Sequence, residues 1–122
     1  MILSLYLSLQ TLIKLIKLNN IKNILIISDT HQRSYNELHN EIKKQISNAN
    51  LVIHCGDITS ENVINGIKKN AKQSILVHGN SDPKEIRESL PMKKIFQIND
   101  ISVQVYLGLV YHHERDTPIL LL

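Results

Sequence analysis

Three apolar runs in this chain end on side chains that can bind a metal ion. NILIISDTH ends on Asp29 and His31, LVIHCGD ends on Asp57, and ILVHGNSD contains Asn80. Two carboxylates, an imidazole and an amide oxygen form a donor set suited to a hard-to-borderline divalent cation. A cation would also offset the repulsion and the lost solvation of two carboxylates at the edge of an apolar core.

Each of these residues has a simpler interpretation when taken alone, because a single Asp after a strand is more often a helix N-cap than a ligand. The pattern recurs three times, however, and a histidine follows the first Asp by two residues. Gly56 and Gly79 stand directly before Asp57 and Asn80, where glycine permits a sharp turn and leaves room for a ligand. Taken together, the set favours a metal site.

The apolar periodicity predicts how these residues are brought together. We expect buried strands over 24–28, 51–54 and 74–78, and an antiparallel hairpin formed by 93–98 and 101–106. Strands that alternate with helices pair in parallel through right-handed crossovers, and the carboxyl ends of such strands share one edge of the sheet. The four candidate ligands should therefore meet on one rim of an α/β fold.

Helices are expected between these strands. The apolar spacing predicts one that starts at Ser34–Glu37 and continues through about Ser47, one over 61–69 and one after Pro83. Their expected start signals are a Ser34–Glu37 capping box, Thr59 or Ser60 as a cap, and Asp82 as an N-cap before Pro83.

The motifs Asp29-x-His31, Gly56-Asp57 and Gly79-Asn80 resemble the first three blocks of the calcineurin-like metallophosphoesterases, over residues 22–106. Asn80-Ser81-Asp82 is similar to the small bacterial and archaeal phosphodiesterase branch. The resemblance implies a layered α/β sandwich with a dinuclear centre: Asp29 and His31 on one metal, Asp57 bridging, Asn80 on the second. It also implies a phosphate ester substrate and a nucleophile made from water, with Mn²⁺ as the expected metal and Zn²⁺, Fe²⁺ or Ni²⁺ as alternatives.

The sequence departs from this family pattern after the hairpin. Leu107 stands before Gly108 where the family has a histidine, and the family's final Gly-His-x-His block does not occur before residue 122. We therefore expect a sandwich that is incomplete at its C-terminal end, with a weakened second metal site. The segment YHHERD, with His112 and His113, is expected to be a solvated loop, and the PILLL tail a strand without a partner that would favour a homo-oligomer.

Three further histidines have interpretations other than a metal ligand. We expect His39 to face solvent on the polar side of the first helix, and His54 to be buried and hydrogen-bonded rather than to bind metal. His78 fits a contact to bound phosphate and a packed strand end equally well.

Composition limits the remaining possibilities. The net charge of +3 is spread over several segments and aromatic residues make up only 4%, so no nucleic-acid-binding surface is expected. Cys55 is the only cysteine, which excludes an intrachain disulfide and a thiolate zinc site and favours a cytoplasmic location. The length suits one domain, which we place at 22–122.

Residues 1–21 form a separate apolar extension, expected to be helical. Its aliphatic residues recur on one helix face: Leu5, Leu9, Leu12 and Ile16. We favour a helix that covers an apolar surface, followed by a misassigned translation start, and then membrane contact through residues 1–18.

These observations leave three functional hypotheses. The first is a metal-dependent phosphodiesterase or phosphatase. The second is a non-catalytic scaffold on the same fold, as in a retromer subunit that has lost metal ligands. The third, a phospho-acceptor domain using Asp29 or Asp57, lacks the lysine that such a domain needs near the hairpin.

Overall fold

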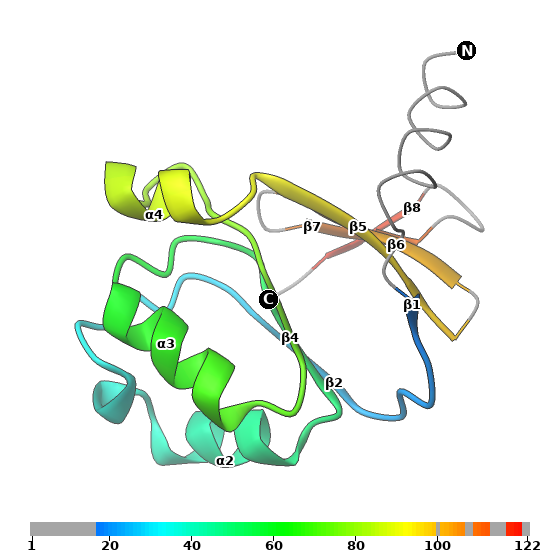
Figure 1. Cartoon of the computed structure of the whole chain (residues 1–122), viewed down its shortest axis with the longest axis horizontal. Helices are drawn as coiled ribbons and strands as arrows, with labels where there is room; N and C mark the ends of the chain where they lie inside the picture. The colour runs from blue at the N-terminus through cyan, green and yellow to red at the C-terminus, as the bar shows by residue number, and fades with distance from the viewer. Residues whose placement is uncertain (1–16, 100, 107–108, 113–116, 121–122) are drawn as a thin grey trace.

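A computed structural model describes residues 17–99, 101–106, 109–112 and 117–120 of the chain (Figure 1). The predictions made for residues 1–16, Leu107, Gly108 and His113 lie outside these residues. Within the described part of the expected N-terminal extension, residues 17–21 are not helical. Among the described residues, no helix is long and apolar enough to cross a membrane.

The strands expected to carry the site form a parallel three-stranded sheet in the order β2-β3-β4. These strands are Ile24–Ile27, Leu51–His54 and Ser74–Leu76, so the first and third end one and two residues earlier than expected. The register pairs Ile27 with His54 and His54 with Leu76. All three strands therefore end at the same level, which is the condition for a shared rim.

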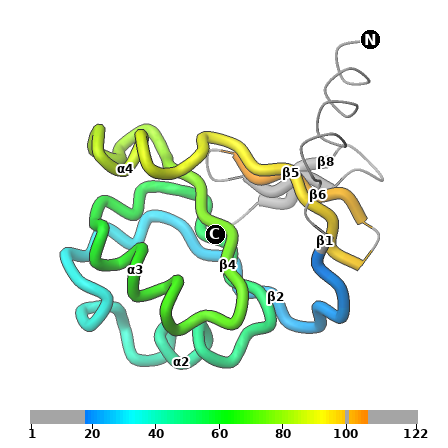
Figure 2. Tube along the Cα trace, in the orientation of Figure 1, coloured from blue at the N-terminus to red at the C-terminus, as the bar shows by residue number. Residues whose placement is uncertain are grey.

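A second described sheet has the order β1-β5-β6-β7-β8, with β1 parallel to β5 and the other pairs antiparallel. Its strands are Lys17–Leu18, Lys93–Ile98, Ile101–Tyr106, Leu109–His112 and Thr117–Leu120. The predicted β5–β6 hairpin is confirmed. Figure 2 shows β1 lying beside β5, although the two strands are far apart in the sequence.

Two predictions for the C-terminal segment are wrong. The tail does have a partner, because Thr117–Leu120 pairs with β7 along its whole length. His112 is not in a loop but is the last residue of β7, where it pairs with Thr117.

Two apolar clusters show that the described residues form three layers. One cluster fills the space between the two sheets, and the other lies between the three-stranded sheet and the helices (Figure 1). Alternate residues of β3 supply both, with Leu51 and Ile53 on one face and Val52 on the other. This layered α/β arrangement confirms the predicted fold class.

The first helical segment differs from its prediction. Ser34 begins only a 3₁₀ turn, η1 (Tyr35–Glu37), and its side chain makes no cap hydrogen bond. Leu38 then adopts an extended backbone and is buried, so the chain leaves the helix to place this side chain in the core. Helix α2 (Asn40–Asn48) starts afterwards, with the His39 side chain accepting a hydrogen bond from the Glu41 N–H.

Helix α3 (Glu61–Asn70) matches its prediction to within one residue, and its expected inward residues Val63, Ile64 and Ile67 are buried. Gly66 lies mid-helix because a Cβ there would meet the Tyr35 side chain, which packs against it. Helix α4 (Lys84–Ser89) has Pro83 rather than Asp82 as its N-cap. The predicted Asp82 cap is therefore wrong, and its carboxylate has other partners.

Candidate metal centre

The loops after β2, β3 and β4 are joined to one another by backbone hydrogen bonds just beyond the strand ends. The Asp29 N–H donates to the Gly56 carbonyl at 3.1 Å, and the Val77 N–H donates to the His54 carbonyl at 3.1 Å. The chain segments that follow the three strands thus remain side by side for one or two residues past the sheet. This places the segments that carry the candidate ligands next to one another.

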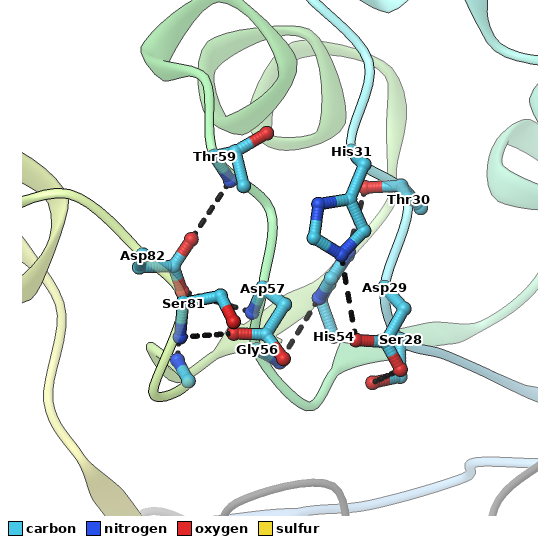
Figure 3. Close-up of polar contacts among 11 residues, drawn as sticks. Ser28, Asp29, Thr30, His31, His54, Gly56, Asp57, Thr59, Ser81 and Asp82 are labelled. Carbon is cyan, nitrogen blue, oxygen red and sulfur yellow. Dashed lines mark hydrogen bonds and ion pairs between the residues drawn. The ribbon is translucent and has the colours of Figure 1, made fainter.

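The side chains of Asp29, His31 and Asp57 converge on this rim (Figure 3). One ligand atom from each lies within 4.8 Å of the others, and His31 Nε2 is 3.6 Å from Asp29 Oδ1. Asp29 and His31 are exposed and Asp57 is half-buried, so the cluster is open to solvent on one side. The predicted convergence of these three residues is confirmed, while their role as metal ligands stays a prediction.

All three residues have left-handed backbone conformations, with φ of 56° at Asp29, 49° at His31 and 60° at Asp57. Non-glycine residues adopt this region infrequently, although Asp, Asn and His are enriched there. Each such residue costs about 1–2 kcal/mol relative to the right-handed region. Backbone strain of this kind clusters at functional sites, where the surrounding structure maintains it.

Gly56 and Gly79 allow the loops after β3 and β4 to touch. Gly56 has φ of +119°, and a Cβ on it would lie 2.6 Å from the Gly79 nitrogen and 2.7 Å from the Gly79 Cα. A Cβ on Gly79 would in turn lie 2.7 Å from the Asp57 Cγ. Gly56 is crowded by the backbone of His78 and Gly79, and Gly79 is crowded first by the Asp57 carboxylate, so both positions require glycine. The φ of Gly56 agrees with the expected sharp turn, while the expected room for a ligand stays a prediction.

The charges at the cluster disfavour ionised Asp57 in the metal-free protein. Burial raises the pKa of Asp57, and the carboxylates of Asp29 and Asp82 raise it further. The Ser81 N–H, which donates to Asp57 Oδ1 at 2.8 Å, opposes this rise. A positive charge bound at the rim would favour the ionised carboxylate, which is the electrostatic requirement of a cation site.

Asn80 is exposed and stands between two residues that contact Asp57. Gly79 packs against the Asp57 carboxylate, and Ser81 donates its N–H to that carboxylate. The loop that carries Asn80 is therefore at the cluster, and the assignment of its amide oxygen to a second metal remains a prediction.

His39, His54 and His78 have defined hydrogen-bond partners. His54 is fully buried and contacts Thr30 Oγ1 at 3.1 Å through Nε2, which confirms the prediction of a hydrogen-bonded core residue. His78 Nδ1 lies 3.3 Å from the Gly79 carbonyl oxygen and is half-buried. His39 is exposed, as predicted, and caps α2.

Sequence reasoning missed the role of Asp82, which is 4% exposed and lies beneath the rim. Its carboxylate accepts the N–H groups of Asp57, Thr59 and Gly79 (Figure 3). A local pattern could identify the residue only as a helix cap, because its partners come from positions 3 to 25 residues away.

The residues present fit a divalent cation. Bond lengths of about 2.0–2.2 Å place two ligand atoms of one ion at most about 4.4 Å apart. The observed separation of up to 4.8 Å among the donors of Asp29, His31 and Asp57 thus needs only small side-chain rotations. Two carboxylates and an imidazole suit several divalent metals, and they do not distinguish among them.

Residues 23–118 match the family model of the calcineurin-like phosphoesterase superfamily domain. The chain is 39% identical over 93 residues to a probable metallophosphoesterase of Methanocaldococcus jannaschii, an alignment that covers 75% of this chain and 45% of that protein. The fold is similar to crystal structures of Vps29 from Chaetomium thermophilum (TM-score 0.55, 18% identity, 66% of this chain and 43% of that one) and Entamoeba histolytica (TM-score 0.55, 14% identity, 71% and 48%). The chain thus spans slightly less than half the length of each of these relatives. It belongs to the calcineurin-like phosphoesterase superfamily.

Proposed function

We propose that this chain forms the metal-binding core of a phosphoesterase that hydrolyses phosphate esters. Asp29, His31 and Asp57 would hold one divalent cation, and Asp57 together with Asn80 would hold a second. The observation that carries the proposal is the convergence of Asp29, His31 and Asp57, from two separate strand-end loops, to within 4.8 Å of one another. Family membership connects this donor set with phosphate esters as the substrate class.

The chain's own residues support a reaction with water rather than with a covalent nucleophile. Cys55 is buried, and burial raises its pKa to about 12, so its thiolate is not formed at neutral pH. The Ser28 hydroxyl donates to Asp29 at 3.2 Å and is thus directed at a candidate ligand. When bound, divalent cations supply polarisation of a phosphoryl oxygen and a more acidic water. Asp29 and His31 are exposed at the rim, where a phosphate ester has access.

Mn²⁺ is the metal that we propose, with Zn²⁺, Fe²⁺ and Ni²⁺ as alternatives for the same ligands. Binding to the folded chain alone would raise the free energy of unfolding by about 2.7 kcal/mol when free Mn²⁺ is 100-fold above its Kd. Thermal denaturation with Mn²⁺ and with a chelator measures this difference. The stabilisation should be absent in Asp57→Asn.

The catalytic test uses an aryl phosphodiester with added Mn²⁺, and it compares the parent chain with two variants. Asp57→Asn removes a proposed ligand, and we expect no turnover. Glu85→Gln makes the same change of charge at an exposed position on α4, outside the proposed ligand set, and we expect parental turnover. Absence of any Mn²⁺-stimulated hydrolysis by the parent would refute the catalytic proposal. A bound-metal stoichiometry near zero would favour the scaffold hypothesis instead.

A further inference from the structure

We propose that Asp82 and His54 are positioning residues, which fix the three strand-end loops relative to one another before a cation binds. Neither belongs to the proposed ligand set, and both are buried side chains that hydrogen-bond across loops. The inference rests on the proposed metal centre for its functional meaning. It concerns contacts that are present without a metal.

Asp82 ties the loop after β3 to the loop after β4. Its Oδ1 accepts the Thr59 N–H at 2.7 Å, and its Oδ2 accepts both the Asp57 N–H at 2.9 Å and the Gly79 N–H at 2.7 Å. Hydrogen bonds to a carboxylate are about twice as strong as neutral ones. Because one of the donors is the backbone of Asp57, the carboxylate sets where that candidate ligand stands.

His54 ties the loop after β2 to the loop after β3. Its Nδ1 accepts the Gly56 N–H at 3.1 Å, so in the neutral ring the proton is on Nε2. That N–H faces Thr30 Oγ1 at 3.1 Å and donates to it. Burial lowers the pKa of His54 to about 4, which keeps the ring neutral at physiological pH. Thr30 stands between Asp29 and His31, so this bond restrains the segment that carries both.

These restraints act on loops that would otherwise relax. Asp29, His31 and Asp57 have left-handed backbones. This backbone strain favours relaxation of the loops in a metal-free chain. Two buried side chains that bridge the three loops hold the donors in place, which lowers the reorganisation needed when a cation binds.

The first test replaces Asp82 with asparagine. The new amide nitrogen cannot accept a hydrogen bond, so at least one of the three N–H groups loses its acceptor. We expect Mn²⁺ affinity, measured by calorimetry on folded protein, to fall about 10- to 100-fold. In the metal-free chain, amide hydrogen exchange should become faster at Asp57, Thr59 and Gly79. Glu85→Gln, the exposed variant with the same charge change, should leave both quantities unchanged.

The second test separates the two hydrogen bonds of His54. His54→Gln keeps a donor near the Nε2 position, whereas His54→Asn keeps an acceptor near the Nδ1 position and loses the Thr30 bond. Thr30→Val should therefore weaken Mn²⁺ binding in the parent and in His54→Gln. It should have no further effect in His54→Asn. If the bond served stability alone, Thr30→Val would leave the Mn²⁺ affinity of the folded protein unchanged in all three backgrounds.

The outcomes distinguish the two proposals. If the parent binds no Mn²⁺, the proposed function fails, and amide exchange in the metal-free chain still decides whether Asp82 positions the loops. If folded Asp82→Asn binds Mn²⁺ as tightly as the parent and exchanges its amides at parental rates, the positioning role is overturned. Lower stability to urea with unchanged Mn²⁺ affinity would also overturn it, because the residue would then serve the fold alone.

Discussion

Replacing Gly56 with alanine should destabilise the chain in two ways, through strain at a left-handed φ and through overpacking against backbone atoms. The φ of +119° is unfavourable for any residue with a Cβ, at a cost of about 1–3 kcal/mol. The new methyl would also lie 2.6 Å, 2.7 Å and 2.9 Å from backbone atoms of Gly79 and His78, which cannot rotate away. Overpacking of this kind costs about 1–3 kcal/mol. The sum is about 2–6 kcal/mol, against a total stability of about 5–15 kcal/mol for a typical domain.

Urea denaturation followed by far-UV circular dichroism measures this loss, with the free energy of unfolding taken at a constant m-value. Gly66→Ala is the comparison without a left-handed φ. Its methyl would meet Cγ, Cβ and Cδ2 of Tyr35 and is therefore overpacked too, but alanine gains about 1 kcal/mol of helix propensity there, so we expect the smaller loss. A loss below about 1 kcal/mol for Gly56→Ala would show that the two loops do not touch as described. A similar loss for both variants would show that the left-handed φ has no special cost.

The remaining predictions concern titration and reactivity. Burial lowers the pKa of His54 from an ordinary value of 6.5 to about 4, so between these pH values the unfolded chain binds a proton that the folded chain does not. The free energy of unfolding should therefore fall by up to about 3 kcal/mol as pH drops from 6.5 to 4. The difference between the urea-denaturation profiles of the parent and His54→Gln over this pH range isolates the effect, and parallel profiles would contradict it. Asp29→Asn should lower the pKa of Asp57 only part of the way toward its ordinary range, because burial, the larger cause of the raised pKa, remains. NMR titration of the Asp57 carboxyl measures this change, and an unchanged or higher pKa would be evidence against a close approach of the two side chains. Cys55, with its pKa raised to about 12 by burial, should react with a disulfide reagent at pH 8 only after denaturant is added, and rapid labelling of the native chain would be inconsistent with its burial.

The sequence was most informative where local pattern and tertiary structure agree. Short β-branched runs located β2, β3 and β4. The expected burial holds throughout β3 but is wrong for β2, which lies at the edge of the three-stranded sheet with its residues exposed or half-buried. The rule that parallel strands end at a common edge then brought Asp29, His31 and Asp57 together without any knowledge of the register. The hairpin β5–β6 followed from two alternating runs with Asn99 and Asp100 between them in the sequence.

Local pattern failed where a residue's partners are distant in the sequence. Asp82 matched an N-cap signal, yet its carboxylate binds amides that are offered only after β3 and β4 have paired. Ser34 and Glu37 matched a capping box, but burial of Leu38 ended the helix after one 3₁₀ turn. A local preference for a helix start is weaker than the burial of a large apolar side chain or the hydrogen bonding of buried backbone amides.

The left-handed backbone at Asp29, His31 and Asp57 has a consequence for engineering. Glycine at any of these positions would relieve about 1–2 kcal/mol of conformational strain while removing a donor. A screen that rewards heat resistance alone would accordingly enrich glycine at the rim and discard the cation site. Libraries built on this chain need selection for metal retention alongside selection for melting temperature.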